Sequence, residues 1–444
     1  MSLPDDVLDH ILSFLQFDFR ALKACSQSDP RFIPLVKRHL YANITLHDYD
    51  FVAISEPTHG VRTAEFIDLL SHNPHIANYI RSLEFSIAFN LTGFILENVI
   101  SILRMCSLVK TVTFRYTGSI YIALAWVSLP ENFRLAFLDC LHLPSVKAVS
   151  IIDVSGFPLT ALSSSNSVKS LTIVGCPPGP KFVPLETLCY PLLEHLTIQR
   201  CSQEALQKII TWVQPYNLRS LEVMLLESHD TTQLSRFFSG CSNTLTSLSL
   251  DIRRECKYNF LLLKVTSNFF CLIVQSSYLF GARHVNTVSH PATTLFLSLS
   301  SLLCLERLVI RADLDFLNHN GIPGVNEFRS SIPSMARVLK TALPVQHLTL
   351  DFHFHLNSHL YIPYDSESLW SPLVSLISES ASPYTNLRVM ASGFLGRDAM
   401  TDHILSSFSQ CTNLTQMVEQ GVLVIMIKPV ALKPLHIPSS EERS

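Results

Sequence analysis

Hydrophobic and polar positions divide the chain into a short helical segment and a long repetitive one. Near the N-terminus, apolar residues recur every three or four positions, as on one face of an α-helix: Val7, Leu8, Ile11, Leu12, Phe14 and Leu15. Pro4 fits the first helical turn, where a missing N–H costs nothing, and Asp5 and Asp6 favour the positive end of the helix dipole. The spacing predicts a first helix with one wholly apolar side.

Two further helices are predicted before Tyr41. Asp18 is a capping residue for a helix through Leu22, and Asp29 and Pro30 begin a third helix. The apolar positions of this third helix are Phe32, Leu35, Val36 and Leu40. A core of three helices, each of roughly ten residues, is only marginally stable by itself. We therefore expect a partner or the rest of the chain to cover it.

A second pattern, apolar-x-x-Leu-x-apolar, recurs along the rest of the chain. Its clearest copies are Val168-Lys-Ser-Leu171-Thr-Ile173-Val-Gly-Cys176 and Leu193-Glu-His-Leu196-Thr-Ile198-Gln-Arg-Cys201. Weaker copies contain Leu83, Val112, Val149, Leu221, Leu248, Leu308, Leu348 and Leu387. From Val149 to Leu248 the steps between copies are 22, 25, 25 and 27 residues, within the roughly 20 to 29 residues of a leucine-rich repeat.

Each copy is interpreted as a short strand, and the amphipathic stretch 204–212 as a helix that covers the outer side. One unit cannot bury its own apolar face, so neighbouring units must stack. The alternative, an ordinary α/β domain with parallel strands, does not predict the return of one phrase at one interval. The predicted fold class is α/β, with a small N-terminal three-helix domain followed by an irregular leucine-rich-repeat solenoid.

The predicted boundaries are 1–46 for the helical domain, 47–427 for the repeat array and 428–444 for a flexible tail. The step from Leu248 to Leu308 breaks the period, and the apolar, aromatic segment 255–290 within it contains no repeat phrase. We interpret this segment as an insertion foreign to the array, or as an intron retained in the gene model. Polar residues interrupt it too often for a membrane span.

The N-terminal segment resembles the F-box, in the F-box-like form common in fungal proteins. The resemblance covers residues 3–41 and rests on Leu3-Pro4, Val7-Leu8, Ile11, Phe14-Leu15, Asp18, Leu22, Cys25-Ser26, Phe32, Arg38 and Leu40-Tyr41. It implies docking onto the Skp-type adaptor of cullin–RING ubiquitin ligases. By position, the implied docking residues are Leu3, Pro4, Val7, Leu8, Ile11 and Leu15. Many members carry a tryptophan-containing stretch where this chain has residues 26–32, which leaves the contact of the third helix open.

Composition narrows the possible partners and compartments. Charged residues make up 16% of the 444 residues and apolar residues 48%, against about 25% charged in a typical protein, so a large interior or a covered face is implied. The net charge is −3 and basic residues cluster only around Arg253 and Arg254, which predicts no nucleic-acid partner. Without a basic leader or a membrane span, we expect a cytoplasmic or nuclear protein whose eleven cysteines stay reduced.

No motif for catalysis or for a cofactor emerges from the sequence. The best metal candidate is His353-Phe-His355 with His359, because alternate strand residues share a face. Loop and edge histidines are the favoured interpretation, so we assign no metal and no cofactor. Cys176 and Cys201 occupy the repeat phrase and are interpreted as packing residues. The same holds for the three tryptophans, Trp126, Trp212 and Trp370.

Stacked repeats present a long sheet surface that can bind a partner. Its central row is predicted as Thr172, Thr197, Glu222, Ser249, Val309 and Thr349, with Arg307 in the flanking row. We take Thr172, Thr197, Glu222, Ser249, Arg307 and Thr349 as candidate target-binding residues, while a merely solvated sheet surface remains an equal alternative. Together the two halves resemble a non-catalytic substrate-recognition subunit of an SCF-type ubiquitin ligase. The alternatives are a leucine-rich scaffold without ligase association and a hydrolase with an unrecognised site.

Overall fold

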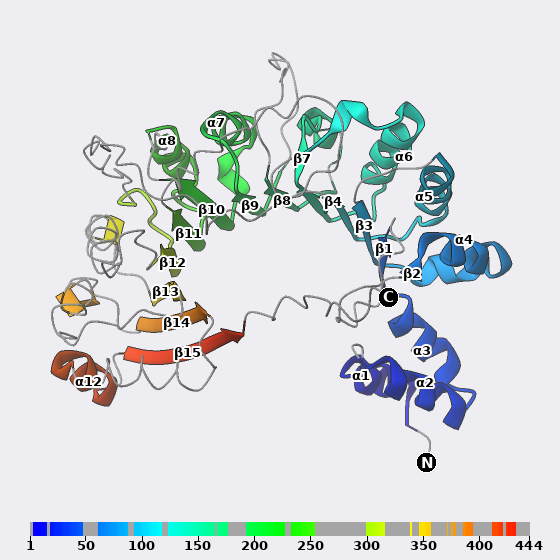
Figure 1. Ribbon diagram of the computed structural model, residues 1–444, viewed down its shortest axis with the longest axis horizontal. Coiled ribbons are helices and arrows are strands. Elements are labelled where there is room, and N and C mark those ends of the chain that lie inside the picture. The colour runs from blue at the N-terminus through cyan, green and yellow to red at the C-terminus, as the bar shows by residue number, and fades with distance from the viewer. Residues whose placement is uncertain are drawn as a thin grey trace, which may run out of the picture.

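The computed structural model describes most of the chain from residue 3 to residue 431. The described ranges are 3–15, 18–47, 61–87, 93–117, 123–163, 165, 167–175, 192–226, 232–253, 299–315, 338–339, 346–356, 371, 374–375, 377–378, 385–393, 411–420 and 423–431. Within them the fold is α/β, with three N-terminal helices followed by a parallel sheet of 13 strands. The strands line the inner side of an arc and the larger helices lie on its outer side (Figure 1).

The N-terminal unit consists of α1 (Asp5–Ser13), α2 (Phe19–Ser28) and α3 (Phe32–Leu40). Pro4 precedes α1 as predicted, and the Asp18 side chain accepts a hydrogen bond from the Ala21 N–H at 2.9 Å, which confirms the predicted cap of α2. The third helix begins at Phe32, two residues after the predicted Pro30. Five apolar side chains form a small separate core: Leu8, Leu12, Leu22, Leu35 and Val36.

The strands follow one another across the sheet in chain order. They are β1 (Asn43–His47), β2 (Val61–Arg62), β3 (Ser82–Ile87), β4 (Thr111–Tyr116), β6 (Ala148–Ile152), β8 (Ser170–Val174), β9 (His195–Gln199), β10 (Ser220–Leu226), β11 (Ser247–Arg253), β12 (Arg307–Asp315), β13 (His347–Leu356), β14 (Thr385–Gly393) and β15 (Leu423–Ala431). Only β2 departs from this order, because it pairs with the outer edge of β1. Every described pair is parallel, and the two-residue strands β5 (Leu124–Ala125) and β7 (Val154–Ser155) form a second small sheet.

Each of the ten copies of the repeat phrase forms a strand. The register pairs Leu171 with Leu196, then with Leu221, Leu248 and Leu308 in turn, and all five are buried. Because β12 pairs directly with β11, the long step before Leu308 adds no strand between them. The predicted insertion at 255–290 lies outside the described residues.

Helices connect the strands and cover the outer face of the sheet. They are α4 (Thr63–His72), α5 (Gly93–Met105), α6 (Glu131–Leu141), α7 (Gln203–Trp212), α8 (Thr232–Gly240) and α12 (Thr412–Glu419), with 3-10 turns η1 (Pro74–Tyr79), η2 (Trp126–Ser128), η3 (Leu159–Leu162) and η4 (Pro215–Asn217). α7 confirms the predicted helix, and Ser202 caps it by accepting a hydrogen bond from the Ala205 N–H. Trp126 and Trp212 are buried as expected, whereas Trp370 lies outside the described residues.

Three neighbouring strands end in a residue with left-handed backbone geometry. Asp153, Gly175 and Arg200 follow β6, β8 and β9 with φ of 56°, 65° and 51°. The Arg200 Nη2 donates to both carboxylate oxygens of Asp153, at 2.9 and 3.1 Å, across the intervening glycine. A Cβ on Gly175 would lie 1.8 Å from the Asp153 Oδ1. We call these three residues the strand-end clamp.

The structure moves two predicted boundaries. Residues 43–47 form β1, whose pairing with β3 places them in the sheet rather than in the helical unit. Two residues join α3 to β1. The join is held to the sheet because the Ala42 carbonyl accepts hydrogen bonds from the N–H groups of Arg81 and Ser82, each at 2.8 Å. At the other end β15 continues to Ala431, so the tail does not begin at residue 428. Among the described residues, no helix combines the length and apolar character that a bilayer crossing requires.

Candidate functional site

The first candidate surface is the outward side of α1. Leu3, Val7, Ile11 and Phe14 are 53%, 38%, 47% and 76% exposed. The spacing of Val7, Ile11 and Phe14 by three or four residues places them on one side of the helix, and Leu3 lies two residues before the helix begins. We call these four residues the N-terminal apolar face. Exposed apolar side chains that gather on one surface, rather than lying singly, mark an interaction site.

The structure sorts the six predicted docking residues into two groups. Leu3, Pro4, Val7 and Ile11 are exposed. Leu8 is 8% exposed and belongs to the core of the three-helix unit, and Leu15 is half-buried against the same core. Leu8 is therefore not part of the exposed face, because a core this small needs it beside Leu12.

The sequence analysis left Phe14 out of the docking residues, although it is the most exposed member of the face. Its place three residues after Ile11 is the signal that could have included it. The Phe14 ring packs edge-on against the His10 imidazole, with ring centroids 5.1 Å apart. This contact fixes the ring beside α1 while leaving most of it open to solvent.

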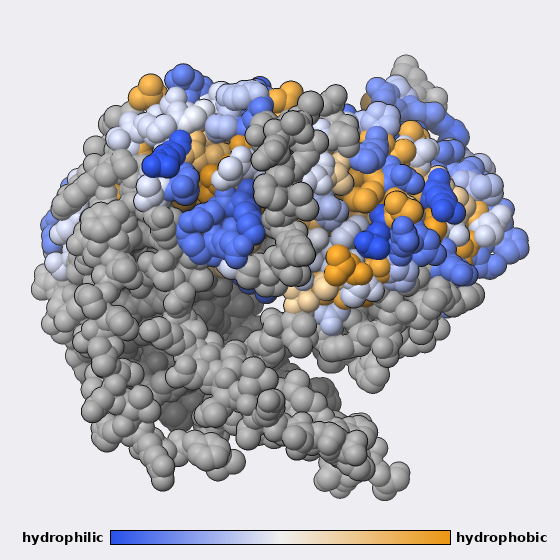
Figure 2. All heavy atoms as spheres, turned by 90° about the horizontal axis from the view of Figure 1, so that it is seen from above, coloured by the Kyte–Doolittle hydropathy of each residue, from blue (hydrophilic) through white to orange (hydrophobic). Residues whose placement is uncertain are grey.

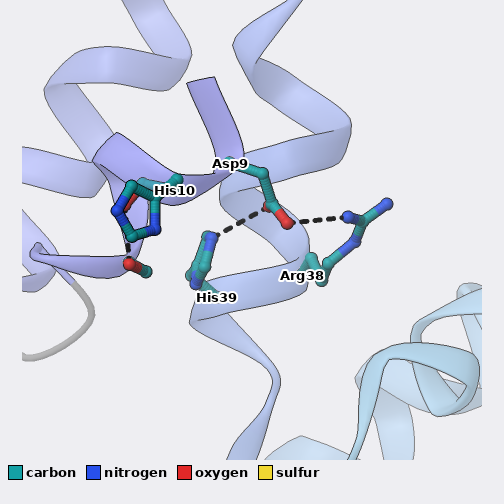
Figure 3. A network of polar contacts seen from close by, with 5 residues as sticks. Asp9, His10, Arg38 and His39 are labelled. Carbon is teal, nitrogen blue, oxygen red and sulfur yellow. Dashed lines mark hydrogen bonds and ion pairs between the residues drawn. The ribbon is translucent and has the colours of Figure 1, made fainter. Parts of the chain in front are cut away.

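Polar contacts on the other side of α1 hold it against α3. The Asp9 carboxylate accepts hydrogen bonds from the Arg38 Nη1 and contacts the His39 Nε2, each at 3.0 Å (Figure 3). The Arg31 Nη2 donates to the Leu3 carbonyl at 2.9 Å and pairs with Asp5 at 3.3 Å. These contacts orient α1 so that its apolar face points away from α3.

The second candidate surface is the inner side of the sheet. The register pairs Thr172 with Thr197, then Glu222, Ser249, Val309 and Thr349 in succession, so the predicted row is one continuous line. We call this line the inner row. Thr172, Thr197 and Glu222 are half-buried, whereas Ser249 and Thr349 are buried and offer less surface than expected. Arg307 is exposed and lies one row away, as predicted.

A group of charged residues beside the inner row was missed by the sequence analysis. The Arg311 Nη1 donates to the Glu222 Oε1 at 2.5 Å, and its Nε lies 3.6 Å from the Asp351 Oδ2. The Gln199 Nε2 donates to the same Glu222 oxygen at 2.8 Å. The strands β12 and β13 continue beyond the repeat phrase. Arg311 and Asp351 each lie two residues after a position of the inner row, so strand alternation places them on the same face.

The outer side of the arc offers no comparable grouping in its described part. Hydrophobic and hydrophilic residues are interspersed there (Figure 2). The exposed apolar side chains of this part of the chain include Val127 beside α6 and Leu135 within it. We treat them as ordinary surface residues, since single exposed apolar side chains are normal.

The buried cysteines are not reactive. Burial raises the pKa of the thiols of Cys106, Cys140 and Cys241 to about 12, and for Cys106 the neighbouring Cys140 adds to the effect. Cys201 is buried, as its place in the repeat phrase predicts. Cys176 lies outside the described residues. A thiol with a raised pKa is a poor nucleophile at neutral pH, so these residues act in packing.

The predicted histidine group lies only partly within the described residues. His353 and His355 belong to β13, but their side chains and the whole of His359 lie outside the described residues. Within the described part of the chain, no group of three or more His, Cys, Asp or Glu residues is arranged to hold a metal ion.

Comparison with the models of known protein families, and with curated proteins, finds no match to this chain.

Proposed function

We propose that the protein is the substrate-recognition subunit of an SCF-type cullin–RING E3 ubiquitin ligase. The N-terminal apolar face docks the Skp-type adaptor, and the inner side of the sheet holds a target protein. The observation that carries the proposal is the exposure of Val7 and Ile11. The downstream sheet does not cover these residues, and the three-helix unit has its own separate core.

The sheet is proposed to be an irregular leucine-rich-repeat solenoid. Two features support this interpretation. Its strands follow chain order, and equivalent leucines from successive copies stand side by side. A stack of this kind buries a continuous core between strands and outer helices, which is what single repeats cannot do alone. It also leaves the inner side of the sheet free to contact another protein.

Such a receptor performs no chemistry of its own. It holds a target near the ubiquitin-transferring subunits, and the gain in rate comes from effective concentration and orientation. The alternative is a leucine-rich scaffold whose N-terminal helices contact no ligase adaptor. The presence or absence of adaptor binding distinguishes the two.

The test is direct binding of purified Skp-type adaptor to the full chain and to the variant Val7→Asp/Ile11→Asp. Two carboxylates placed in an apolar interface should cost about 3 kcal/mol or more, which weakens binding by roughly a hundredfold. Because both positions are exposed in the free protein, the variant should fold normally, with a change of no more than about 0.5 kcal/mol in stability. Circular dichroism checks this.

The matched control is Val127→Asp/Leu135→Asp, which places the same charges on two apolar residues of the outer side that are more exposed than Val7 and Ile11. It should bind the adaptor as the unmodified chain does. Equal binding by the α1 variant and the control would contradict the receptor assignment. Absence of adaptor binding by the unmodified chain would favour the scaffold.

A further inference from the structure

Basic residues stand side by side at the start of four neighbouring strands. Arg81, Lys110, Lys147 and Lys169 immediately precede β3, β4, β6 and β8. Each is joined to the next through the backbone, because the N–H of the later residue donates to the carbonyl of the earlier one at 2.7 or 2.8 Å. We call these four residues the strand-start row. They lie far apart in the sequence, so only the fold brings them together.

The fold turns the side chains of the strand-start row out of the core. In each copy the residue before the row and the residue two positions after it are buried, as Val146 and Val149 are beside Lys147. Lys110 and Lys147 are exposed, and Arg81 and Lys169 are half-buried. Because the strands are parallel, all four residues lie at one edge of the sheet.

The positive charge of the row is largely uncompensated. Within the described part of the chain, only Lys169 of the four pairs with a carboxylate, and its Nζ lies 3.7 Å from the Glu194 Oε1. The Arg81 Nη1 and the Lys147 Nζ donate to backbone carbonyls, which carry no charge. Neighbouring strands are about 4.8 Å apart, and like charges opposite one another destabilise a sheet. An anion bound along the row would remove this cost.

The shape of the row favours a polypeptide as the source of that anion. The next position of each strand borders the inner side, and these residues are Ser82, Thr111, Ala148 and Ser170. None is aromatic, whereas surfaces for single-stranded nucleic acid carry aromatic side chains on which bases stack. Glu194 ends the row on the β9 side, so the positive charge forms a line about 14 Å long rather than a broad face for a membrane. About four residues of an extended chain cover this length.

We propose that the strand-start row binds an acidic, extended segment of the target polypeptide, whose Asp or Glu side chains pair with Lys110 and Lys147. The inference rests on the proposed function and names the chemistry of the target. The position of the row agrees with that function. The Arg81 N–H donates to the Ala42 carbonyl at the join with α3, so the row begins one strand away from the helical unit that docks the adaptor.

The experiment measures the fluorescence anisotropy of a labelled peptide of six Glu-Ser repeats as the full chain is added. It is made at about 0.05 M NaCl, where the Debye length is above about 10 Å. A labelled peptide of six Gln-Ser repeats, a labelled single-stranded oligothymidylate and vesicles containing phosphatidylserine are measured alongside. These probes separate an acidic polypeptide from a neutral one, from nucleic acid and from a lipid surface.

The test variant is Lys110→Gln/Lys147→Gln. The matched control is Arg104→Gln/Arg236→Gln, which removes the same net charge from exposed positions of the outer helices α5 and α8. All four substituted residues are exposed, so both variants should fold normally. Circular dichroism and adaptor binding are measured for each.

The acidic peptide should bind the unmodified chain about tenfold or more tightly than the neutral peptide does. Loss of two exposed ion pairs in the test variant should weaken this binding about fivefold, and the control should leave it nearly unchanged. Absence of acidic-peptide binding, an equal loss in the control, or tighter binding of the oligothymidylate or the vesicles through the same lysines would each overturn the inference. A chain that binds the acidic peptide but no adaptor refutes the receptor assignment and upholds this inference, and the reverse result overturns this inference alone.

Discussion

Substitution of Gly175 by alanine should lower the free energy of unfolding by more than the cost of the positive φ at this position alone. The residue has φ of 65°, a conformation that costs an alanine about 1–2 kcal/mol. Its new Cβ would also lie 1.8 Å from the Asp153 Oδ1, so the carboxylate must move away from Arg200. Loss of this partly exposed ion pair adds about 0.5–1 kcal/mol. The expected total is about 1.5–3 kcal/mol.

Gly156→Ala provides the matched control. Gly156 has φ of 68°, and a Cβ there would meet nothing within 4 Å. This variant should therefore lose only the backbone contribution, about 1–2 kcal/mol. The measurement is urea unfolding followed by circular dichroism, with free energies extrapolated to water. Equal losses for the two variants would refute the role assigned to the strand-end clamp.

A second substitution tests the same contact from the other side. Asp153→Gly removes the carboxylate that the new Cβ would strike and tolerates the positive φ. In that background Gly175→Ala should cost no more than Gly156→Ala does. The coupling between positions 153 and 175 should therefore be about 1 kcal/mol, and additivity would argue against the clash.

Three further predictions concern packing, the helical unit and the thiols. Trp126→Ala removes a ring that is 3% exposed and packs edge-on against Phe157, with ring centroids 4.9 Å apart. The variant should lose about 3–5 kcal/mol of unfolding free energy, measured in urea, and a loss below about 1 kcal/mol would contradict this. Asp9→Ala should weaken amide hydrogen-exchange protection in α1 and α3 by about 1 kcal/mol, and the exposed Asp6→Ala should not. At pH 8 iodoacetamide should label Cys304, which is exposed, long before the buried thiols. The thiols of Cys106, Cys140 and Cys241 have a pKa raised from 9.0 to about 12, so unfolding releases protons above pH 9 and stability should fall as the pH rises from 9 to 12. A constant unfolding free energy over that range would contradict the raised values.

The strands were predictable because their signal is local and repeats. Each copy of the phrase places a leucine or a valine at the buried position, and the register brings these residues side by side. At β14 the signal fails, because Thr385 rather than Leu387 stands beside Leu348. A buried threonine at a leucine position hides the true phase of that strand. The first strand, β1, was missed because it follows directly on a helical pattern.

The candidate surfaces were predictable only in part. Spacing identified the apolar side of α1, but the six docking residues were taken by position from the family resemblance. That choice included Leu8, which the small core buries, and left out Phe14, which is exposed. The charged group beside the inner row depends on a contact between Glu222 and Arg311, which are 89 residues apart. This contact forms because β12 pairs with β11 in a particular register. Sequence patterns are local and do not specify how strands pair across the long segment that separates β11 from β12.

The short join between the helices and the sheet has a mechanical consequence. Two residues separate α3 from β1, and the Ala42 carbonyl accepts hydrogen bonds from the N–H groups of Arg81 and Ser82 at the start of β3. The helical unit therefore has a fixed orientation relative to the sheet. A target protein bound on the inner side and an adaptor bound on α1 would then have a relative orientation that the backbone sets. Inserting glycine and serine residues into this join would replace a rigid connection by a flexible linker. The effective concentration of a protein bound on α1 near one bound on the inner side would then fall.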